Sequence, residues 1–336
     1  MRSLPFLHLR GDHYHLGLQM GEQLRPQIKE SLRILQRLAK TFPQYDLAHF
    51  ITLARAYVPY ARRAFPHLYR EFEGIVAGSG QDHDLVWLLN VEEILFDEYF
   101  TKCTSFVLKE KDNSLTLYHN EDFDAGFQNN TAVVHATLPN KTSFISLCFP
   151  GMLPGSSVSV NSSGLIQAIN SLDPVDTRIG IPKNFIARAV LEAHTIPQAI
   201  GIIRQQQRAS AYNHILLQGN TGVSVETTAR AFKILPLRQF PFVHTNHYLH
   251  TFKNKWPLPG SRKRYHTVTR FLGSSPADPW TVLSAHTPYA ICHHPRPGLM
   301  QATVASLRIN SVARALAITP GNPCRTQPKN YSLVLQ

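Results

Sequence analysis

The sequence predicts an α+β fold in which antiparallel sheets lie between layers of helices. Three observations support this prediction. The first 102 residues carry apolar side chains at helical spacing, the residues after them form short strand-like runs, and two later helical stretches separate groups of strands. Because strands come in groups and do not alternate one for one with helices, antiparallel sheets packed against helices are favoured. A chain of 336 residues with 43% hydrophobic content can bury the large core that such layers need.

The N-terminal third is predicted to be mainly helical. One apolar stripe recurs at Leu16, Met20, Leu24, Ile28 and Leu32. This spacing puts the five side chains on one face of a helix. Similar stripes continue through Leu53, Tyr57 and Leu85 to Ile94.

The first group of strands is predicted to begin at residue 103. Its runs alternate apolar and polar side chains or are rich in β-branched residues: CTSFVLKE, SLTLYHN, TAVVHATL, SFISLCF and SVSV. Turn-forming residues separate the runs, among them Lys111-Asp112-Asn113 and Pro139-Asn140. This pattern is typical of an antiparallel sheet.

Helices and strands continue in groups through the rest of the chain. A helical stretch from about residue 185 to 207 is interrupted at Pro197, and strands return at NHILLQG, GVSVETT and AFKILPL. The phrase GNTG between the first two is expected to form a hairpin turn. A third helical region covers residues 264–272 and 280–286, and the tail is strand-like at ATVASLRI, ARALAIT and YSLVLQ.

The charge balance favours anionic small molecules over nucleic acids as partners. The net charge is +12, from 34 Lys and Arg against 22 Asp and Glu, but the basic residues are scattered. The densest cluster, Arg262-Lys263-Arg264, is short and has no nucleic-acid-binding motif beside it. We therefore expect a small-molecule substrate and no nucleic-acid partner.

The sequence favours a cytoplasmic location without a membrane partner. Charged residues and histidines from His8 to His13 interrupt the N-terminal apolar stretch, so a signal-peptide core is not expected. Apolar runs stay well below the roughly 18 residues typical of a membrane span. The four cysteines, at positions 103, 148, 292 and 324, form no Cys-x-x-Cys pair, which indicates neither a zinc ribbon nor a disulfide framework and fits a reducing compartment.

Cys103 stands where the helical third meets the first strand, within DEYFTKCTSFVL. A cysteine at such a position is by itself more often a small buried apolar residue than a nucleophile. Its neighbours change this interpretation. The stretch Lys102-Cys103-Thr104-Ser105, a strand, and then His119-Asn120-Glu121-Asp122 resemble the nucleophile region of the acyl-coenzyme A:isopenicillin N acyltransferase family, whose pattern is Cys-Thr-Ser or Cys-Thr-Thr followed by Asn-x-Asp.

The resemblance extends in order along nearly the whole chain. GDHYHLGLQMGEQL is similar to the family's opening helix, VNSSGLIQAIN to its Asn-x-x-Gly-Leu hairpin, and NHILLQGNTGVSVETT to its strand, turn and Glu-ended strand. His244-Thr245-Asn246-His247 resembles the family's His-Thr-Asn-His box. GSRKRYH, Ile291-Cys292 and Gly321-Asn322-Pro323-Cys324 complete the series.

Members of this family are N-terminal-nucleophile (Ntn) hydrolases, related to the choloylglycine and penicillin V acylases. The resemblance implies a four-layer αββα sandwich of two antiparallel sheets between helical layers. It also implies self-cleavage between Lys102 and Cys103, which divides one composite domain into a helical pro-segment, residues 1–102, and a catalytic chain, residues 103–336. The family usually has Gly where this chain has Lys102, whose larger side chain is expected to slow or prevent cleavage.

Cleavage would leave a free α-amine on Cys103, so that one residue supplies both nucleophile and base. The ordinary pKa of an α-amine, roughly 7.7 to 8.0, leaves a useful fraction unprotonated near neutral pH to take the thiol proton. The thiolate would attack an amide or thioester carbonyl, and water or an acceptor amine would resolve the acyl-enzyme. The implied substrates are small acyl amides or acyl-coenzyme A thioesters, and no cofactor is implied.

The resemblance assigns roles to further residues. It implies that Asn246 donates a hydrogen bond to the oxyanion and that Asp122 holds the α-amine and thiol of Cys103. Arg264 is expected to steady the nucleophile or a substrate carboxylate. Asn120 and His247 are candidates for supporting residues.

Two interpretations compete with this one. An uncleaved relative could keep the fold as a non-catalytic binding or scaffold protein, or an unprocessed Cys103 could act with His244 or His247 as a conventional Cys-His pair. A metal site is not expected, because no His-Glu-x-x-His motif or carboxylate-rich companion accompanies His244, His247, His250 or His293-His294. The sequence leaves the oligomeric state open.

Overall fold

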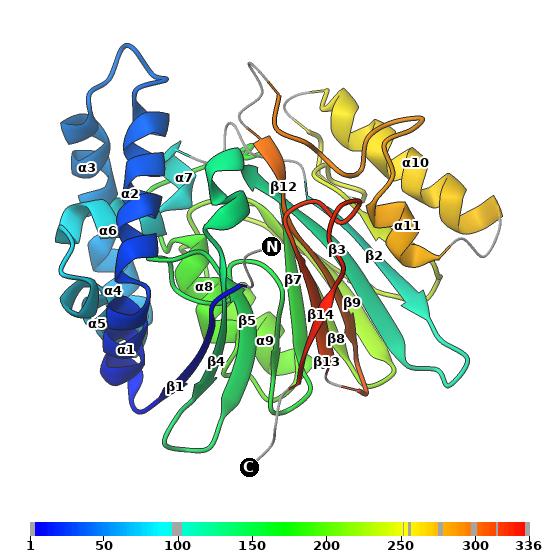
Figure 1. Cartoon of the computed structure of the whole chain (residues 1–336), viewed down its shortest axis with the longest axis horizontal. Coiled ribbons are helices and arrows are strands. Elements are labelled where there is room, and N and C mark those ends of the chain that lie inside the picture. The colour runs from blue at the N-terminus through cyan, green and yellow to red at the C-terminus, as the bar shows by residue number, and fades with distance from the viewer. Residues whose placement is uncertain are drawn as a thin grey trace.

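Two β-sheets stack face to face between two layers of helices in the computed structural model (Figure 1). The described residues are 4–95, 103–250, 252–254, 257–274, 278–296, 301–313 and 315–332. Helices from the N-terminal third and the middle of the chain lie against one sheet, and two later helices lie against the other. The predicted αββα order of layers is confirmed.

The first helical layer combines N-terminal helices with two from the middle of the chain. Its members are α1 (His13–Gln23), α2 (Arg25–Ala39), α3 (Leu47–Arg55), α4 (Val58–Ala64), α5 (Pro66–Ser79), α6 (His83–Asn90), α7 (Glu92–Leu95), α8 (Lys183–Val190) and α9 (Ile196–Ile203). The side chains of Asp12, Asp46 and Asp82 accept hydrogen bonds from main-chain N–H groups at the starts of α1, α3 and α6. These caps fix where the three helices begin.

The sheet that faces this layer has eight strands in the order β1-β4-β5-β6-β7-β8-β9-β10. They are β1 (Phe6–Arg10), β4 (Ala132–Thr137), β5 (Ser143–Cys148), β6 (Ser159–Asn161), β7 (Ile166–Ser171), β8 (Tyr212–Gln218), β9 (Thr221–Thr227) and β10 (Phe232–Pro236). All pairs are antiparallel except β1 with β4. The predicted VNSSGLIQAIN hairpin joins β6 and β7, and Gly164 in its turn has the positive φ of 75° that favours glycine.

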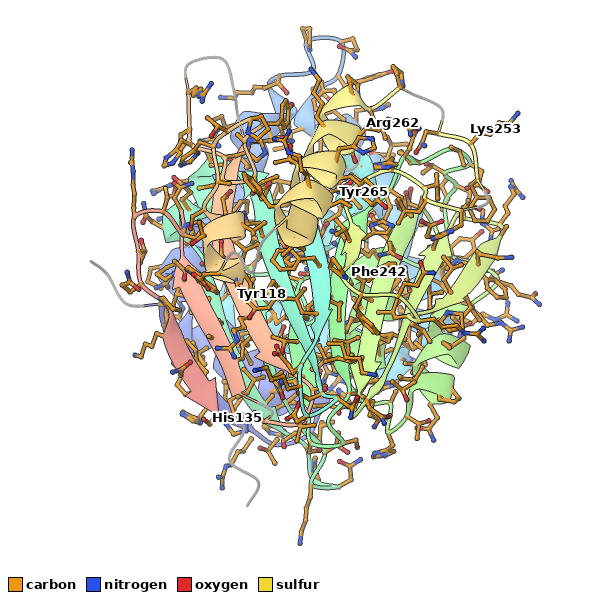
Figure 2. All side chains as sticks on the ribbon, turned by 90° about the vertical axis from the view of Figure 1, so that its right-hand side faces the viewer. Tyr118, His135, Phe242, Lys253, Arg262 and Tyr265 are labelled. Carbon is orange, nitrogen blue, oxygen red and sulfur yellow. The ribbon has the colours of Figure 1, made fainter. Side chains whose placement is uncertain are left out.

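The second sheet has six antiparallel strands in the order β11-β2-β3-β12-β13-β14. They are β11 (Phe242–His244), β2 (Thr104–Lys109), β3 (Leu115–Asp124), β12 (Gln301–Asn310), β13 (Ala315–Pro320) and β14 (Lys329–Ser332). A short 3-10 helix, η1 (Ala125–Asn129), follows β3. Helices α10 (Pro259–Ser274) and α11 (Pro279–Leu283) cover the outer face of this sheet (Figure 2).

Adjacent residues of one strand pack into different hydrophobic clusters on the two faces of their sheet. In β4, Val133 packs between the two sheets, whereas Val134 packs against the helices. In β2, Val107 packs between the sheets, whereas Phe106 packs toward α10 and α11. A period of two is what pleated strands buried on both faces require. Alternate side chains of β2 and β3 therefore face either the eight-stranded sheet or the α10–α11 layer.

One element of the N-terminal third differs from the prediction. Residues 6–10 form the strand β1, within a segment that the sequence predicts to be mainly helical. Exposed and buried side chains alternate along FLHLR, but five residues are too few for this period to stand out beside the helical stripes. Pairing with β4 brings the N-terminal segment into the eight-stranded sheet. Among the described helices, none has the length and apolar character needed to cross a membrane.

Candidate active site

Cys103 immediately precedes β2, and its side chain is buried, with 4% exposed. Pairing of β2 with β3 aligns Thr104 with Asn120, so the next position along the register places Cys103 opposite Glu121. The Cys103 Sγ atom lies 3.5 Å from Glu121 Oε1, to which the thiol donates, and 4.0 Å from the main-chain oxygen of Asp122. The nucleophile predicted from the sequence therefore lies directly beside a carboxylate.

This environment opposes ionisation of the thiol. Burial raises the pKa of Cys103 well above its ordinary value, and the negative charges of Glu121 and Asp122 raise it further. The positive charge of Arg264 acts in the opposite direction but does not reverse the shift. A neutral thiol is a weak nucleophile, so chemistry at Cys103 requires a nearby group that accepts its proton.

Glu121 belongs to a buried chain of hydrogen bonds. Its Oε2 lies 3.1 Å from His119 Nε2 and accepts a hydrogen bond from the Ser157 hydroxyl. The His119 Nδ1 atom lies 2.7 Å from Ser105 Oγ, and that hydroxyl donates to Asn170 Oδ1 at 3.0 Å. These contacts hold the carboxylate in one orientation beside the cysteine.

The sequence prediction included Asn120 and Asp122 but not Glu121, which occupies the unspecified middle position of the Asn-x-Asp pattern. The hairpin register was the signal that could have identified it. Once β2 and β3 pair around the Lys111–Asn113 turn, the residue opposite Cys103 is Glu121. Side chains at directly opposed positions of antiparallel strands lie close together.

Arg264, on α10, connects two other predicted site residues, Cys103 and Asn246. Its Nη1 donates to the main-chain oxygen of Cys103 at 2.7 Å and to Thr104 Oγ1 at 2.8 Å, and its Nη2 donates to Asn246 Oδ1 at 2.7 Å. The side chain is 1% exposed. Burial lowers the pKa of this guanidinium, while the negative charge of Asp122 acts to raise it.

The Arg264 contact fixes the orientation of the Asn246 amide. A guanidinium only donates hydrogen bonds, so the Asn246 atom beside it must be the oxygen. The Nδ2 atom of Asn246 therefore points the other way, where it donates to the main-chain oxygen of Ser171 at 3.0 Å. Ser171 lines the same pocket as Cys103, so the Asn246 amide is hydrogen-bonded to a residue of that pocket.

The Asp122 side chain is held by β12 and by the segment that follows α11. Thr303, on β12, donates to Asp122 Oδ1 at 2.6 Å, and His293 Nε2 lies 3.7 Å from Asp122 Oδ2. The pairing of β12 with β3 shifts by one residue between Thr303 and Ala305, directly opposite Asp122. Such irregularities commonly re-aim a side chain beside a functional site.

The two supporting candidates make contacts of a different kind. Asn120 donates to the main-chain oxygens of Leu283 and Ile291, at 2.9 and 3.1 Å, and so fastens the region after α11 to β3. His247 Nδ1 lies 2.8 Å from Ser261 Oγ, and burial lowers the pKa of His247 to about 4. Both side chains have structural partners.

His244, the other histidine considered as a base, is also engaged elsewhere. Its Nε2 lies 3.1 Å from Glu226 Oε1, and its Nδ1 lies 2.8 Å from the main-chain oxygen of Thr245. Lys102, the other half of the predicted cleavage site, lies outside the described residues.

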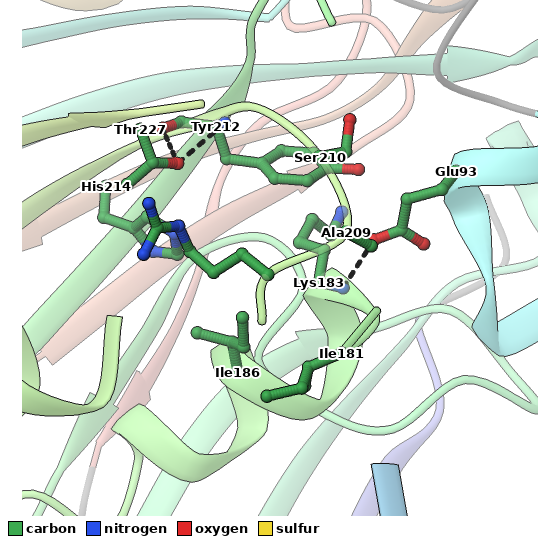
Figure 3. A pocket seen from close by; sticks show the side chains of 10 residues that line it. Glu93, Ile181, Lys183, Ile186, Ala209, Ser210, Tyr212, His214 and Thr227 are labelled. Carbon is green, nitrogen blue, oxygen red and sulfur yellow. Dashed lines mark hydrogen bonds between the residues drawn. The ribbon is translucent and has the colours of Figure 1, made fainter. Parts of the chain in front are cut away.

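A small pocket opens beside the thiol. Its lining residues are Glu92, Cys103, Glu121, Asp122, Phe123, Phe149, Ser156, Ile169, Ser171 and Lys183. Within it, Lys183 Nζ lies 2.6 Å from Glu92 Oε2. Lys183 also lines a neighbouring pocket, where its main-chain N–H donates to Glu93 Oε1 at 2.7 Å (Figure 3). These contacts dock α7, the last described helix before Cys103, onto the start of α8.

The four-layer sandwich is the fold of the Ntn hydrolases, a class of amide hydrolases and acyltransferases. The family is shown by sequence: the profile described as "Acyl-coenzyme A:6-aminopenicillanic acid acyl-transferase" matches residues 108–278, and the chain belongs to this family. The resemblance found in the motifs is confirmed.

The chain is also similar to individual proteins of known function or structure. The chain is 28% identical over 224 residues to the beta-alanyl-dopamine/carcinine hydrolase of Drosophila melanogaster, a match that spans 60% of this chain and 58% of that relative. Two crystal structures of variants of the conjugated bile acid hydrolase from Clostridium perfringens are 11% identical to this chain. They superpose with TM-scores of 0.43 and 0.46 and cover 70% and 69% of this chain, and 98% and 97% of their own.

Proposed function

We propose that this chain is a self-processing amide hydrolase or acyltransferase that uses Cys103 as its nucleophile and acts on small acyl amides or thioesters. The observation that carries the proposal is the buried Cys103 thiol, which contacts Glu121 while Arg264 holds the carbonyl of the same residue. Family membership supports the class of reaction. The roles of the individual residues are inferred from their contacts.

Self-processing begins with attack of the Cys103 thiol on the carbonyl carbon of Lys102. Glu121 accepts the thiol proton, the new S–C bond forms, and the C–N bond between the two residues breaks as the nitrogen takes up a proton. Water then hydrolyses the thioester, which leaves a carboxylate on Lys102 and restores the thiol. Arg264 holds the main-chain oxygen of Cys103 during this exchange, so the residue keeps its position while its nitrogen is released.

The mature site then uses the released α-amine as the proton acceptor. The amine takes the thiol proton, the thiolate attacks the substrate carbonyl, and the amine returns the proton to the departing nitrogen or sulfur. Asn246 is suited to stabilise the oxyanion, because Arg264 holds its oxygen and its amide nitrogen therefore faces away from Arg264, toward Ser171, a residue that lines the pocket. Asp122 lies close enough for its negative charge to raise the pKa of both Cys103 and Arg264. It is therefore suited to bind the α-amine of Cys103 when that amine is protonated.

The pocket favours a cationic acyl group over an anionic one. Its lining carries three carboxylates, Glu92, Glu121 and Asp122, and one ammonium, Lys183. A substrate ammonium would therefore meet complementary charge inside the pocket, although the chain as a whole is basic. The name of the Drosophila relative, a beta-alanyl-dopamine/carcinine hydrolase, fits this preference.

Intact-mass analysis and N-terminal sequencing of the purified chain test the processing step. The expected result is two fragments, the second beginning CTSFVL, and a single inactive chain for Cys103→Ala. An uncut wild-type chain without amidase activity would favour the scaffold alternative. An uncut chain that hydrolyses amides and loses this activity in Cys103→Ala would favour a conventional cysteine hydrolase. In that case His119 would be the histidine to test, because it lies in the Cys103 cluster whereas His244 and His247 have other partners.

The charge preference is tested with three amides of one amine. A β-alanyl amide, its uncharged propionyl counterpart and its anionic succinyl counterpart differ mainly in terminal charge. We expect kcat/KM to be highest for the β-alanyl amide and lowest for the succinyl amide. The reverse order would refute the charge preference and leave the nucleophile proposal intact.

A further inference from the structure

Two cysteines and two histidines gather outside the candidate active site. His286, Cys292 and His294 lie in the segment that follows α11, and Cys324 lies between β13 and β14. One possible ligand atom from each of the four lies within 4.8 Å of every other. Cys292 is buried, His294 is partly buried, and His286 and Cys324 are exposed, so the cluster lies just beneath the surface.

The separations within this cluster suit a tetrahedral metal ion. The two sulfur atoms are 3.7 Å apart, and His294 Nε2 lies 3.2 Å from Cys324 Sγ and 3.9 Å from Cys292 Sγ. Typical Zn–S and Zn–N bond lengths at tetrahedral angles place two sulfur ligands about 3.8 Å apart and a sulfur and a nitrogen ligand about 3.6 Å apart. Cys292, Cys324 and His294 are therefore close to the spacing that a central zinc ion would impose, and a ring nitrogen of His286 lies within 4.8 Å of the other three ligand atoms.

Neighbouring groups are arranged as they are around metal ligands. The His286 Nδ1 atom lies 3.2 Å from the main-chain oxygen of Cys292, a contact that requires a proton on Nδ1 and leaves Nε2 free to bind a metal. Asn322 Nδ2 donates to Cys292 Sγ at 3.2 Å, a hydrogen bond that stabilises a thiolate. Metal-bound histidines and thiolates commonly have such partners.

We propose that His286, Cys292, His294 and Cys324 bind one Zn²⁺ ion with a structural role. Two sulfur and two nitrogen ligands are the set that zinc prefers, and four protein ligands leave no position for a reacting water. Binding releases one proton from each thiol to solvent, and no oxidant or reductant takes part. The proposal is independent of the function proposed for Cys103.

The ion would connect the segment that follows α11 to the loop between β13 and β14, and both are linked by hydrogen bonds to Asp122. Asn322, two residues before Cys324, donates to the main-chain oxygen of His293 at 2.7 Å. The main-chain N–H of His293 donates to Thr303 Oγ1 at 2.8 Å, and that hydroxyl donates to Asp122 Oδ1 at 2.6 Å. The zinc site would thus fix the segment that supports the Asp122 carboxylate.

Metal analysis of the full chain, purified under reducing conditions without added metal, tests the proposal. We expect one equivalent of zinc in the wild type and in Cys103→Ala, and none in Cys324→Ser. Cys103→Ala is the matched control, because Cys103 with His119 and Glu121 forms another thiol-containing cluster that could bind a metal. Circular dichroism checks that Cys324→Ser, a change at an exposed position, remains folded, and His286→Asn provides a second exposed ligand substitution.

Cobalt substitution provides a geometric readout. Replacing zinc by Co²⁺ should give the visible bands of tetrahedral cobalt and a thiolate-to-cobalt charge-transfer band, and both should disappear in Cys324→Ser and His286→Asn. Three results would overturn the proposal. The first is a chain that takes up neither ion, and the second is loss of zinc in Cys103→Ala with retention of zinc in Cys324→Ser. The third is an intact mass, measured under reducing conditions, that shows Cys292 and Cys324 joined as a disulfide.

Discussion

The immediate surroundings of Cys103, the proposed nucleophile, determine which group can accept the proton of its thiol. The Cys103 thiol is held neutral by burial and by nearby negative charge, and its pKa is raised accordingly. Before any chain cleavage the α-amine does not exist, so the first proton transfer needs another acceptor. Glu121, whose Oε1 lies 3.5 Å from the sulfur, is a group with the required chemistry and position.

We therefore predict that Glu121→Gln slows self-cleavage at Cys103. The amide keeps the size of the side chain but cannot accept the thiol proton as a base, and loss of a general base typically slows a reaction by roughly 100-fold to 10,000-fold. The rate at which the CTSFVL fragment appears, followed by intact mass, measures the effect. Glu30→Gln, at an exposed position on α2, serves as control. Cleavage of Glu121→Gln at the wild-type rate would exclude this role.

At Arg264 the geometry of the side chain matters as much as its charge. One guanidinium reaches Cys103, Thr104 and Asn246, through two nitrogens. Arg264→Lys keeps the positive charge but cannot span these acceptors. We predict that kcat falls by roughly 100-fold or more because the Asn246 amide loses its fixed orientation, with a smaller change in KM.

The matched control for this substitution is Arg262→Lys on the same helix, where the side chain is exposed (Figure 2). Steady-state kinetics with one amide substrate compare the two variants, and thermal unfolding monitors the fold. Equal kcat values for both variants would show that Arg264 does not position the catalytic groups.

Residues of the candidate site could be proposed from the sequence where a local motif contains them. Cys103, Asn246 and Arg264 each lie in a recognisable stretch, and the structure brings all three together. Glu121 was missed because its significance depends on strand register. The proposed zinc site differs from the expectation of no metal site for a similar reason: its two cysteines are 32 residues apart, and only the fold brings their sulfur atoms within 3.7 Å of each other.

At the scale of elements, α1 and α5 approach so closely that glycines line their contact. A Cβ atom at Gly74 would lie 2.2 Å from the main-chain oxygen of Tyr14, and one at Gly17 would lie 1.9 Å from that of Glu71. Backbone atoms cannot move aside as a flexible side chain can, so the two helices would have to separate.

We predict that Gly74→Ala lowers the free energy of unfolding by about 1–3 kcal/mol or more, the usual cost of overpacking. Gly201→Ala is the matched control, because Gly201 lies within α9 and an added Cβ would meet nothing within 4 Å. There we expect stabilisation by about 0.4–1 kcal/mol through the loss of unfolded-state freedom. Urea denaturation measures the free energy of unfolding of both variants. A Gly74→Ala variant as stable as the wild type would argue against the close packing of α1 and α5.

Element types were largely predictable from sequence, because long apolar stripes and alternating runs reflect burial directly. The paired helices α8 and α9, interrupted near Pro197, and the hairpin of β8 and β9 agree with the prediction. The exception, β1, depends on pairing with β4, which begins more than 120 residues later. Partner choice over such a distance leaves little trace in five residues.

At the scale of the whole molecule, a buried ion pair connects the segments on either side of Cys103. Arg188, on α8, donates from Nε and Nη2 to the two oxygens of Glu71, on α5, each at 2.8 Å. Burial alone would raise the pKa of Glu71, but the charge and hydrogen bonds of Arg188, together with the hydrogen bond of His13, outweigh it and lower the pKa below 4.5. The pair therefore stabilises the fold most where Glu71 is ionised.

The sign of the pH dependence follows from this lowered pKa. The contribution of Glu71 is fully present above the ordinary carboxyl pKa of 4.5 and is lost as the pH falls through the folded-state value. We predict that Arg188→Met lowers the free energy of unfolding by about 3–5 kcal/mol near neutral pH, because the buried Glu71 carboxylate loses both hydrogen bonds from Arg188 and, among the described residues, keeps only the contact with His13 Nδ1 at 2.9 Å. The difference from wild type should shrink as the pH falls below 4.5. A difference that stays constant in acid, measured by urea denaturation, would contradict the assigned role of Glu71.

The same cross-connections bear on what happens if the chain is cut before Cys103. β1 is hydrogen-bonded to β4, Arg37 Nη2 lies 2.5 Å from Asp124 Oδ1, and Lys183 pairs with Glu92. The first helical layer and the eight-stranded sheet therefore each contain residues from both fragments. A segment built into the sheet and the core cannot leave without exposing apolar surface. We therefore predict that the cleaved protein elutes from size exclusion as one species containing both fragments, which separate only in denaturant. Release of residues 1–102 in native buffer would show instead that the N-terminal segment is a detachable pro-peptide.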